Sequence, residues 1–287
     1  MRQALVTDIA WPDLDVERSV LEPAGFAVRL AGAEDEATLT REAAGVDAIL
    51  TCFAQVTAAV IGASEQLGVV ARTGVGLDNI DVAECERRGI AVTRVPDYCV
   101  DEVATHTLAL VLSLWRRLPQ YDAALRAGAW GTDPTGLPVR RLAGARACVL
   151  GMGRIGGEVA SRLRACGVSI GSEVDGADIL TLHVPLNPQT RHLVDAELLA
   201  RLAPGAIVVN TGRGGLVDHD ALLAALESRR LAGAGLDVFD PEPLPSDHPL
   251  RRRTDVVLTP HVAFYSEEAL VELRRRAAQS VVDHFTR

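Results

Sequence analysis

The fold of this chain is decided by the stretch ACVLGMGRIGGEVASRL, residues 147–163. An apolar strand runs directly into Gly151, Gly153 and Gly156, which have the spacing Gly-x-Gly-x-x-Gly, and an amphipathic helix follows. In that context the first glycine permits a tight turn and the second lets a pyrophosphate approach the backbone. The third allows close packing of the helix against the strand. The stretch therefore predicts nucleotide binding, and the alternative is a glycine-rich turn without a ligand.

Strands and helices alternate on both sides of this stretch. Short buried strands separated by amphipathic helices are typical of a parallel α/β sheet. A long amphipathic helix is expected over residues 266–285. Further strands are expected within residues 3–8, 26–32, 46–52, 67–74 and 90–96 before the stretch, and within 179–185, 206–212, 231–239 and 255–263 after it.

The composition excludes several classes of function. The chain has 287 residues, of which 48% are hydrophobic and 23% charged, as in ordinary globular proteins. Its net charge of −9 argues against a nucleic acid or an anionic membrane as partner. The arginine runs 251–253 and 274–276 are expected to be solvated or helix-end charges. All 29 basic residues are arginine, which excludes Schiff-base lysine chemistry and leaves arginine or backbone N–H groups to hold anions.

Cysteine usage predicts a cytoplasmic protein. The five cysteines are widely spaced and contain no Cys-x-x-Cys pair, so neither a disulfide framework nor a metal site is expected. The N-terminal residues lead straight into a strand, so no signal peptide is expected. No apolar run approaches the roughly 18 residues that a membrane span needs.

Three polar residues follow three different strands and suggest acid–base chemistry. Arg213 lies in VVNTGRGGLVD, Glu242 in LDVFDPEP and His261 in VVLTPHVAFYSEEA. Ligands bind at the carboxyl ends of parallel strands, so these side chains are expected to converge on one crevice. Arg213 can hold a carboxylate through two hydrogen bonds, and Glu242 can orient His261 and favour its protonated form. Taken singly, a histidine is more often structural and a loop glutamate more often solvated.

A fourth candidate lies in ARTGVGLDNIDV. Gly74, Val75 and Gly76 follow a strand, and small residues there leave backbone N–H groups able to face an anion. The alternative is an ordinary turn between a strand and a helix.

Together these stretches closely resemble the D-isomer-specific 2-hydroxyacid dehydrogenase family. RTGVGLDNID, GMGRIG, NTGRGGLVD, LDVFDPEP and TPHVAFYSEEA occur in the family's order over nearly the whole chain. YCVDEVA and YSEEA look most like its C-terminal-binding-protein-like branch. The resemblance implies a fold of two doubly wound parallel-sheet α/β domains. One is a flavodoxin-like substrate domain (1–100 plus 264–287), and the other is a Rossmann domain (101–263), truncated near 171–178.

The resemblance also implies the roles of individual residues. Arg213 would bind the substrate carboxylate and carbonyl, His261 would be the acid/base, and Glu242 would be its partner. Gly74, Val75 and Gly76 would contact the substrate, and the helix from Asp101 would form a homodimer interface. The cofactor, NAD in preference to NADP, would be bound by Gly151, Gly153, Arg154, Ile155, Gly156, Glu173, Val184, Thr211 and Asp237, with Val75 also in contact.

The second strand of the cofactor domain raises a difficulty. The segment GVSIGSE places Glu173 about 20 residues past the fingerprint, where an acidic residue holds the adenosine ribose. Only Val174 to Asp178 then precede the next strand. Parallel strands of one sheet need a crossover of about a dozen residues or more. We therefore expect either that GVSIGSE is not the usual second strand or that the strand order is rearranged.

This difficulty keeps three functions open. The first is hydride transfer between a nicotinamide cofactor and a small 2-hydroxy or 2-oxo acid. The second is a member without a dinucleotide that uses Arg213, Glu242 and His261 for cofactor-free acid–base chemistry on a small carboxylic acid. The third is a non-catalytic scaffold dimer, which the three converging polar groups disfavour because burying unused polar groups is costly.

Overall fold

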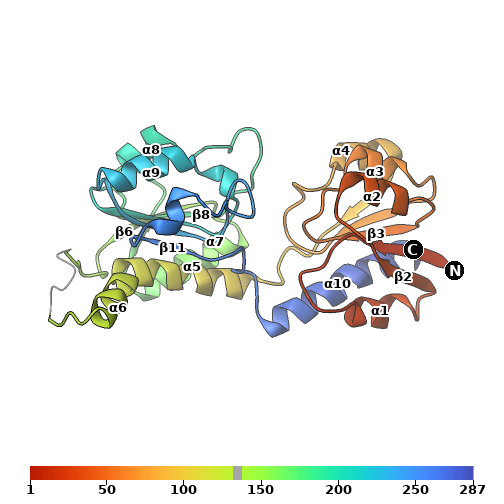
Figure 1. Ribbon diagram of the computed structural model, residues 1–287, viewed down its shortest axis with the longest axis horizontal. Coiled ribbons are helices and arrows are strands. Elements are labelled where there is room, and N and C mark those ends of the chain that lie inside the picture. The colour runs from red at the N-terminus through yellow and green to blue at the C-terminus, as the bar shows by residue number, and fades with distance from the viewer. Residues whose placement is uncertain (132–137, 287) are drawn as a thin grey trace. The chain divides into compact units, whose positions relative to one another are not determined.

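The computed structural model describes residues 1–131 and 138–286. The chain divides into two compact units. The first unit comprises Met1–Tyr98 and Ser266–Arg287, and the second comprises Cys99–Tyr265 (Figure 1).

The first unit is built on a five-stranded parallel sheet of order β2-β1-β3-β4-β5, which is the flavodoxin-like order. Its strands are β1 (Arg2–Val6), β2 (Phe26–Leu30), β3 (Ala48–Thr51), β4 (Val69–Arg72) and β5 (Ala91–Thr93). Its helices are α1 (Asp15–Leu21), α2 (Glu36–Glu42), α3 (Ala58–Gly62), α4 (Val82–Arg88) and α10 (Glu267–Thr286). Helices α1 and α10 cover one face of the sheet, and α2, α3 and α4 cover the other (Figure 1).

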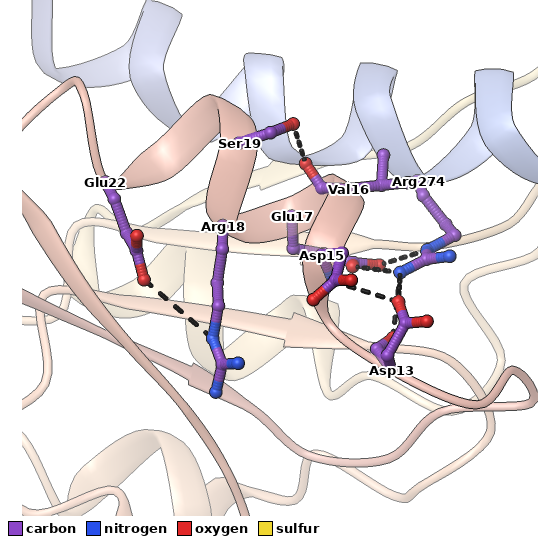
Figure 2. Close-up of polar contacts among 8 residues, drawn as sticks. All are labelled: Asp13, Asp15, Val16, Glu17, Arg18, Ser19, Glu22 and Arg274. Carbon is purple, nitrogen blue, oxygen red and sulfur yellow. Dashed lines mark hydrogen bonds and ion pairs between the residues drawn. The ribbon is translucent and has the colours of Figure 1, made fainter.

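A buried ion pair fastens α10 to α1. Arg274 donates from Nε to Glu17 Oε1 at 2.9 Å and from Nη2 to Glu17 Oε2 at 2.7 Å. It also donates from Nη2 to Asp13 (Figure 2). Its guanidinium lies 5.1 Å from the ring centroid of Trp11. Only 7% of the Arg274 side chain and 2% of the Glu17 side chain are exposed. The expectation that this arginine is solvated is therefore wrong, because α10 turns it inward to a carboxylate far away in the sequence.

The second unit contains a six-stranded parallel sheet of order β11-β10-β9-β8-β6-β7. Its strands are β6 (Arg146–Leu150), β7 (Ser169–Gly171), β8 (Ile179–Leu182), β9 (Ala206–Asn210), β10 (Leu231–Leu236) and β11 (Val256–Leu258). Its helices are α5 (Val100–Trp115), α6 (Leu118–Arg126), α7 (Arg154–Ala165), α8 (Ala196–Arg201) and α9 (His219–Glu227), with short 3-10 turns at Gly214–Leu216 and Pro249–Arg252. The two parallel sheets confirm the predicted fold class.

Helix α5 belongs to the core of this unit. Val111, Leu114 and Trp115 are buried together with residues of α7 and of the sheet. Its apolar residues fit either a core position or a subunit interface, and the homodimer interface that the family resemblance implies stays a prediction. Within the unit, α5 packs across β9, β10 and β11 and beside α7.

The connection from β7 to β8 does not follow our expectation. Both strands pair in parallel with β6, on opposite sides of it, so GVSIGSE does contain the usual second strand. Only residues 172–178 join them. The short link suffices because β7 ends level with Cys148 and β8 begins level with Ala147. The chain therefore returns by only one residue, about 3.3 Å, and crosses two strand spacings of about 4.8 Å. Seven residues can span roughly 23 Å. The expectation that so short a link is impossible was wrong.

The link is packed against the sheet. Val174 and Ala177 are buried in the core on the α8 and α9 face. The backbone N–H of Asp178 donates to the Arg146 carbonyl at 2.9 Å, and the Gly176 N–H donates to the Arg201 carbonyl at 2.8 Å. A loop thus replaces the usual crossover helix, and β7 is the edge strand of the sheet.

Two features are missing from the described part of the chain. None of its helices combines the length and the apolar character that crossing a membrane requires. Across the same residues, no group of three or more His, Cys, Asp or Glu side chains is placed to hold a metal ion.

The Arg274–Glu17 pair predicts a large effect on stability. Arg274→Met should lower the free energy of unfolding by about 3–5 kcal/mol, because it leaves the Glu17 carboxylate buried without its partner. The double variant Arg274→Met, Glu17→Met should recover most of that loss. Urea denaturation measures both, with the exposed neighbour substitution Arg275→Met as control. A loss below about 1 kcal/mol for Arg274→Met would contradict this role.

Candidate active site

The three glycines of the fingerprint have different surroundings. At Gly151, where φ is +95°, an added Cβ would lie 2.6 Å from the carbonyl carbon of His183 at the end of β8. At Gly156 a Cβ would lie 1.9 Å from the carbonyl oxygen of Gly151. At Gly153 it would meet no described heavy atom within 4 Å. The first and third glycines are therefore required by the fold, and the second leaves open space beside the turn.

That open space adjoins the N-terminus of α7. The helix begins at Arg154, and its N-cap residue Gly153 has no side chain to accept hydrogen bonds from the first turn. The first N–H groups of a helix carry partial positive charge and bind anions. Arg154 is exposed and Ile155 half-buried at this end. The turn and helix therefore fit a pyrophosphate, which is the group that the fingerprint predicts.

Other predicted cofactor residues lie at the same edge of the sheet. Exposed Glu173 follows β7, and half-buried Val184 follows β8. Thr211 follows β9, with its hydroxyl 2.9 Å from that of Thr107 on α5. The strand order reverses between β6 and β8, which is where doubly wound sheets bind ligands.

Asp237 has an internal function that the sequence analysis did not anticipate. It follows β10 and is 1% exposed. Its Oδ1 accepts from the Thr259 hydroxyl at 2.6 Å and from the Val262 N–H at 2.9 Å, and its Oδ2 accepts from the Ala263 N–H at 2.9 Å. The carboxylate therefore holds the loop that carries His261. A contact between Asp237 and the cofactor stays a prediction.

His261 and Glu242 form a direct pair. His261 Nδ1 lies 2.8 Å from Glu242 Oε2, and Glu242 Oε1 accepts from the Phe239 N–H at 2.8 Å. His261 has φ of +54°, a left-handed conformation that is uncommon outside glycine, and its N–H donates to the Asp237 carbonyl at 2.7 Å. Both side chains are partly exposed, 25% for His261 and 34% for Glu242. The pair is thus fixed in place yet reachable.

The charge of Glu242 is stabilised by its neighbours. Burial raises the pKa of its carboxyl, but the hydrogen bond and charge of His261 lower it, helped by the Phe239 N–H and the charge of Arg213. The net result is a pKa below the ordinary value for glutamate. Glu242 is therefore ionised at neutral pH and supplies the negative charge that a protonated histidine needs.

Arg213 is brought to this pair by a close approach of two loops. The Asn210 side chain donates to the Arg213 carbonyl at 2.8 Å and accepts from the Gly212 N–H at 3.0 Å, which shapes the turn after β9. An added Cβ at Gly214 would lie 1.9 Å from the carbonyl carbon of Phe239. The loop that carries Arg213 is therefore pressed against the loop that carries Glu242.

The first unit places the other predicted substrate residues after β4. A Cβ at Gly74 would lie 2.5 Å from Nη1 of Arg72, so the glycine makes room for this side chain. The Gly74 carbonyl accepts from the Val95 N–H at 3.0 Å, and the Val75 carbonyl from the Arg94 side chain at 3.3 Å. Gly76 is half-buried.

Arg72 is a candidate that the sequence analysis missed. It is 7% exposed, and its guanidinium bonds the carbonyls of Thr51 and Thr73 and lies 6.0 Å from the ring centroid of Phe53. Among the described residues, no carboxylate forms an ion pair with Arg72, and its buried Nε has no hydrogen-bond partner. A buried unpaired cation is costly and favours binding of an anion. The only signal in the sequence is its place between a strand and the glycine turn.

Comparison with known proteins is consistent with this geometry. Residues 108–173 and 168–263 match the model of the NAD binding domain of D-isomer specific 2-hydroxyacid dehydrogenases. Glyoxylate reductase of Thermofilum pendens is 35% identical over 270 residues, covering 85% of this chain and 80% of that protein. D-3-phosphoglycerate dehydrogenase of Methanocaldococcus jannaschii is 36% identical over 305 residues, covering 98% and 56%. The crystal structure of D-lactate dehydrogenase from Aquifex aeolicus, complexed with NAD and lactic acid, superposes with a TM-score of 0.88 at 26% identity, covering 99% and 95%.

The chain therefore belongs to the D-isomer specific 2-hydroxyacid dehydrogenase family. The predicted class, a nicotinamide-dependent oxidoreductase of 2-hydroxy acids, is confirmed by this membership, as is NAD as the cofactor. The chain spans 56% of the length of the phosphoglycerate dehydrogenase from M. jannaschii that it matches.

The surroundings of Gly153 and Gly156 predict that an added methyl group weakens cofactor binding at the first position and lowers stability at the second. Gly153→Ala should change the free energy of unfolding by less than about 0.5 kcal/mol and weaken NADH binding at least tenfold, about 1.4 kcal/mol, because its methyl enters the open space. Gly156→Ala should destabilise the unit by about 1–3 kcal/mol. Thermal melting and NADH fluorescence titration separate the effects. Unchanged NADH affinity in Gly153→Ala would count against binding at this turn.

Proposed function

We propose that Arg213, Glu242 and His261 carry out the reduction of a small 2-oxo acid to the 2-hydroxy acid. The observation that carries this proposal is the His261–Glu242 pair, with Nδ1 and Oε2 2.8 Å apart, beside the loop of Arg213. The three residues follow β9, β10 and β11, which are neighbours in the sheet. The reaction needs from the protein a group that binds the substrate carboxylate, here Arg213, and a proton donor, here His261 paired with Glu242.

The roles follow from the chemistry of the side chains. Arg213 holds the substrate carboxylate by paired hydrogen bonds and polarises the adjacent carbonyl. His261, protonated and supported by Glu242, gives its proton to the carbonyl oxygen as that oxygen gains negative charge. NADH, when bound, would supply the hydride for C2. The products are the 2-hydroxy acid and NAD⁺, and His261 is reprotonated from solvent.

The residues at the β6–β8 edge fit the dinucleotide. Gly153 and the first turn of α7 would hold the pyrophosphate, with Arg154 and Ile155 at the same helix end. Glu173 would hold the adenosine ribose, while Val184, Thr211 and Asp237 would lie along the nicotinamide half. This arrangement disfavours the cofactor-free alternative, because Gly151 and Gly156 build the turn and Gly153 leaves it open.

We also propose that the cofactor domain is a shortened form of the family's domain. The family model matches in two segments that meet and overlap at residues 168–173. The alignment with the M. jannaschii enzyme extends over 305 residues although this chain has 287, so the relative carries residues that this chain lacks. In the classic order a third strand lies outside the second, whereas here β7 is the edge. The adenosine end would therefore be held mainly by Glu173 and the turn after β6.

The substrate would be a small 2-oxo acid. Gly74, Val75 and Gly76 would contact it from the first unit, and the unpaired guanidinium of Arg72 would favour an anionic group there. Glyoxylate, pyruvate and phosphohydroxypyruvate are the first substrates to test, because they are the 2-oxo acids that correspond to the names of the similar proteins, glyoxylate reductase, D-lactate dehydrogenase and D-3-phosphoglycerate dehydrogenase.

Three further features complete the proposal. We infer a homodimer through the helix that starts near Asp101 (α5) and the α6 helix that follows it, supported by the exposed apolar side chains Leu118, Leu125 and Trp130 at and beyond α6. The stretches YCVDEVA and YSEEA support the C-terminal-binding-protein-like branch. Free cysteines support a reducing, cytoplasmic location.

The proton donor is tested by rates of NADH oxidation at 340 nm with the three 2-oxo acids. His261→Gln should lower kcat about 10²–10⁴-fold, while the control His284→Gln on α10 should leave it unchanged. Glu242→Gln should also lower kcat, because the amide supplies no negative charge beside the proton donor. A His261→Gln enzyme with full kcat would contradict the assignment.

The ribose contact is tested by cofactor preference. Glu173→Gln should lower the ratio of kcat/KM for NADH over NADPH about tenfold, because the carboxylate repels a 2′-phosphate and bonds the ribose hydroxyl. Glu197→Gln, an exposed change in the first turn of α8, is the matched control. An unchanged ratio in Glu173→Gln would remove this residue from the site.

A further inference from the structure

A histidine on α5 reaches the loop that carries the proton donor. His106 Nε2 lies 3.0 Å from the hydroxyl oxygen of Thr259, which directly follows β11 and precedes His261 by two residues. Its ring is partly exposed, and Nε2 is also 3.8 Å from Oδ1 of Asp237. None of the roles proposed above uses this histidine.

The hydrogen bonds determine which nitrogen of His106 carries a proton. The Thr259 hydroxyl has a single hydrogen, and it donates this hydrogen to Asp237 Oδ1 at 2.6 Å. The hydroxyl oxygen can then only accept from His106. His106 therefore carries a hydrogen on Nε2, either as the neutral Nε2–H tautomer or as the cation.

The same contacts continue to the backbone of the catalytic loop. The Oδ1 atom of the buried Asp237 carboxylate accepts hydrogen bonds from the Thr259 hydroxyl and the Val262 N–H, and its Oδ2 atom accepts one from the Ala263 N–H. These are the two residues that follow His261, whose own N–H donates to the Asp237 carbonyl. The left-handed backbone of His261 is thus held on both sides by one aspartate.

We infer that His106 is a positioning residue of the dehydrogenase. Its Nε2–H orients the Thr259 hydroxyl, and this hydroxyl bonds the Asp237 carboxylate. The carboxylate in turn holds residues 261–263, so that His261 faces Glu242. Helix α5 is a rigid anchor for this chain of contacts because it is packed across β9, β10 and β11. The inference rests on the proposed role of His261 and adds a residue on α5 that determines the position of His261.

Two matched pairs of variants test it. His106→Gln keeps an N–H donor at the position of Nε2, and His106→Leu removes it. Thr259→Ser keeps the hydroxyl, and Thr259→Val removes it at nearly the same shape. Thr286→Val, which removes an exposed hydroxyl from α10, controls for loss of a hydroxyl in general.

The first readout is kinetic. His106→Leu and Thr259→Val should lower kcat about tenfold or more, because small errors in placing a catalytic group are costly. The KM for the 2-oxo acid, set by Arg213, should change less than about twofold, and the conservative variants should restore kcat to within about threefold of the wild type. Loss of thermal stability with unchanged kcat would show a merely structural role and overturn the inference.

The second readout does not depend on activity. Hydrogen exchange of the Val262 and Ala263 amides, followed by NMR, should accelerate at least tenfold in His106→Leu and Thr259→Val and stay slow in the conservative variants. If wild-type protein reduces none of the 2-oxo acids but the amides respond in this way, the proposed function fails and the positioning chain stands. Unchanged exchange in His106→Leu would overturn the inference whatever the activity.

Discussion

Parallel pairing of all six strands in the second unit is the constraint on which the rest of the structure depends. Every strand ends at the same edge of the sheet, so residues far apart in the sequence come together there. The order of the strands then divides the edge into two parts. The turns after β7, β6 and β8 carry most of the residues predicted to bind the dinucleotide. The turns after β9, β10 and β11 carry Arg213, Glu242 and His261, together with the predicted cofactor residues Thr211 and Asp237.

Within that edge, backbone contacts place the reactive side chains more firmly than long side chains could. Gly214 lets the Arg213 loop lie directly on the backbone of Phe239, whose N–H in turn holds Glu242. Asp237 holds the His261 loop through two amides and a hydroxyl. Placing catalytic groups on rigid, hydrogen-bonded backbone reduces the reorganisation needed during the reaction. Glu242 stays ionised although it is partly buried, because the hydrogen bond and charge of His261, helped by the Phe239 N–H, lower the pKa of its carboxyl.

Much of this site could be predicted from the sequence because its signals are local. The glycine spacing and a polar residue just after an apolar strand both report positions that the topology brings together. Contacts between distant residues left no such signal. The residues next to Arg274 in the sequence do not indicate that it pairs with Glu17. Likewise, the residues next to Asp237 do not indicate that its carboxylate accepts a hydrogen bond from the Val262 N–H.

The link between β7 and β8 shows a different limit. The general rule for parallel crossovers assumes strands of ordinary length, whereas β7 has three residues and ends only one residue level beyond the start of β8. Strand length was therefore the missing quantity, and hydrophobic pattern alone predicts it poorly. Arg72 was missed for another reason: an arginine at a strand end is usually solvated, and its burial depends on the space left by Gly74.

We expect that the cofactor domain, despite its short link, binds a dinucleotide productively. Calorimetric titration of the full chain with NADH tests this most directly. We expect saturable one-to-one binding with a dissociation constant in the micromolar range, which is a binding free energy of about −8 kcal/mol. Absence of binding up to millimolar NADH would contradict it.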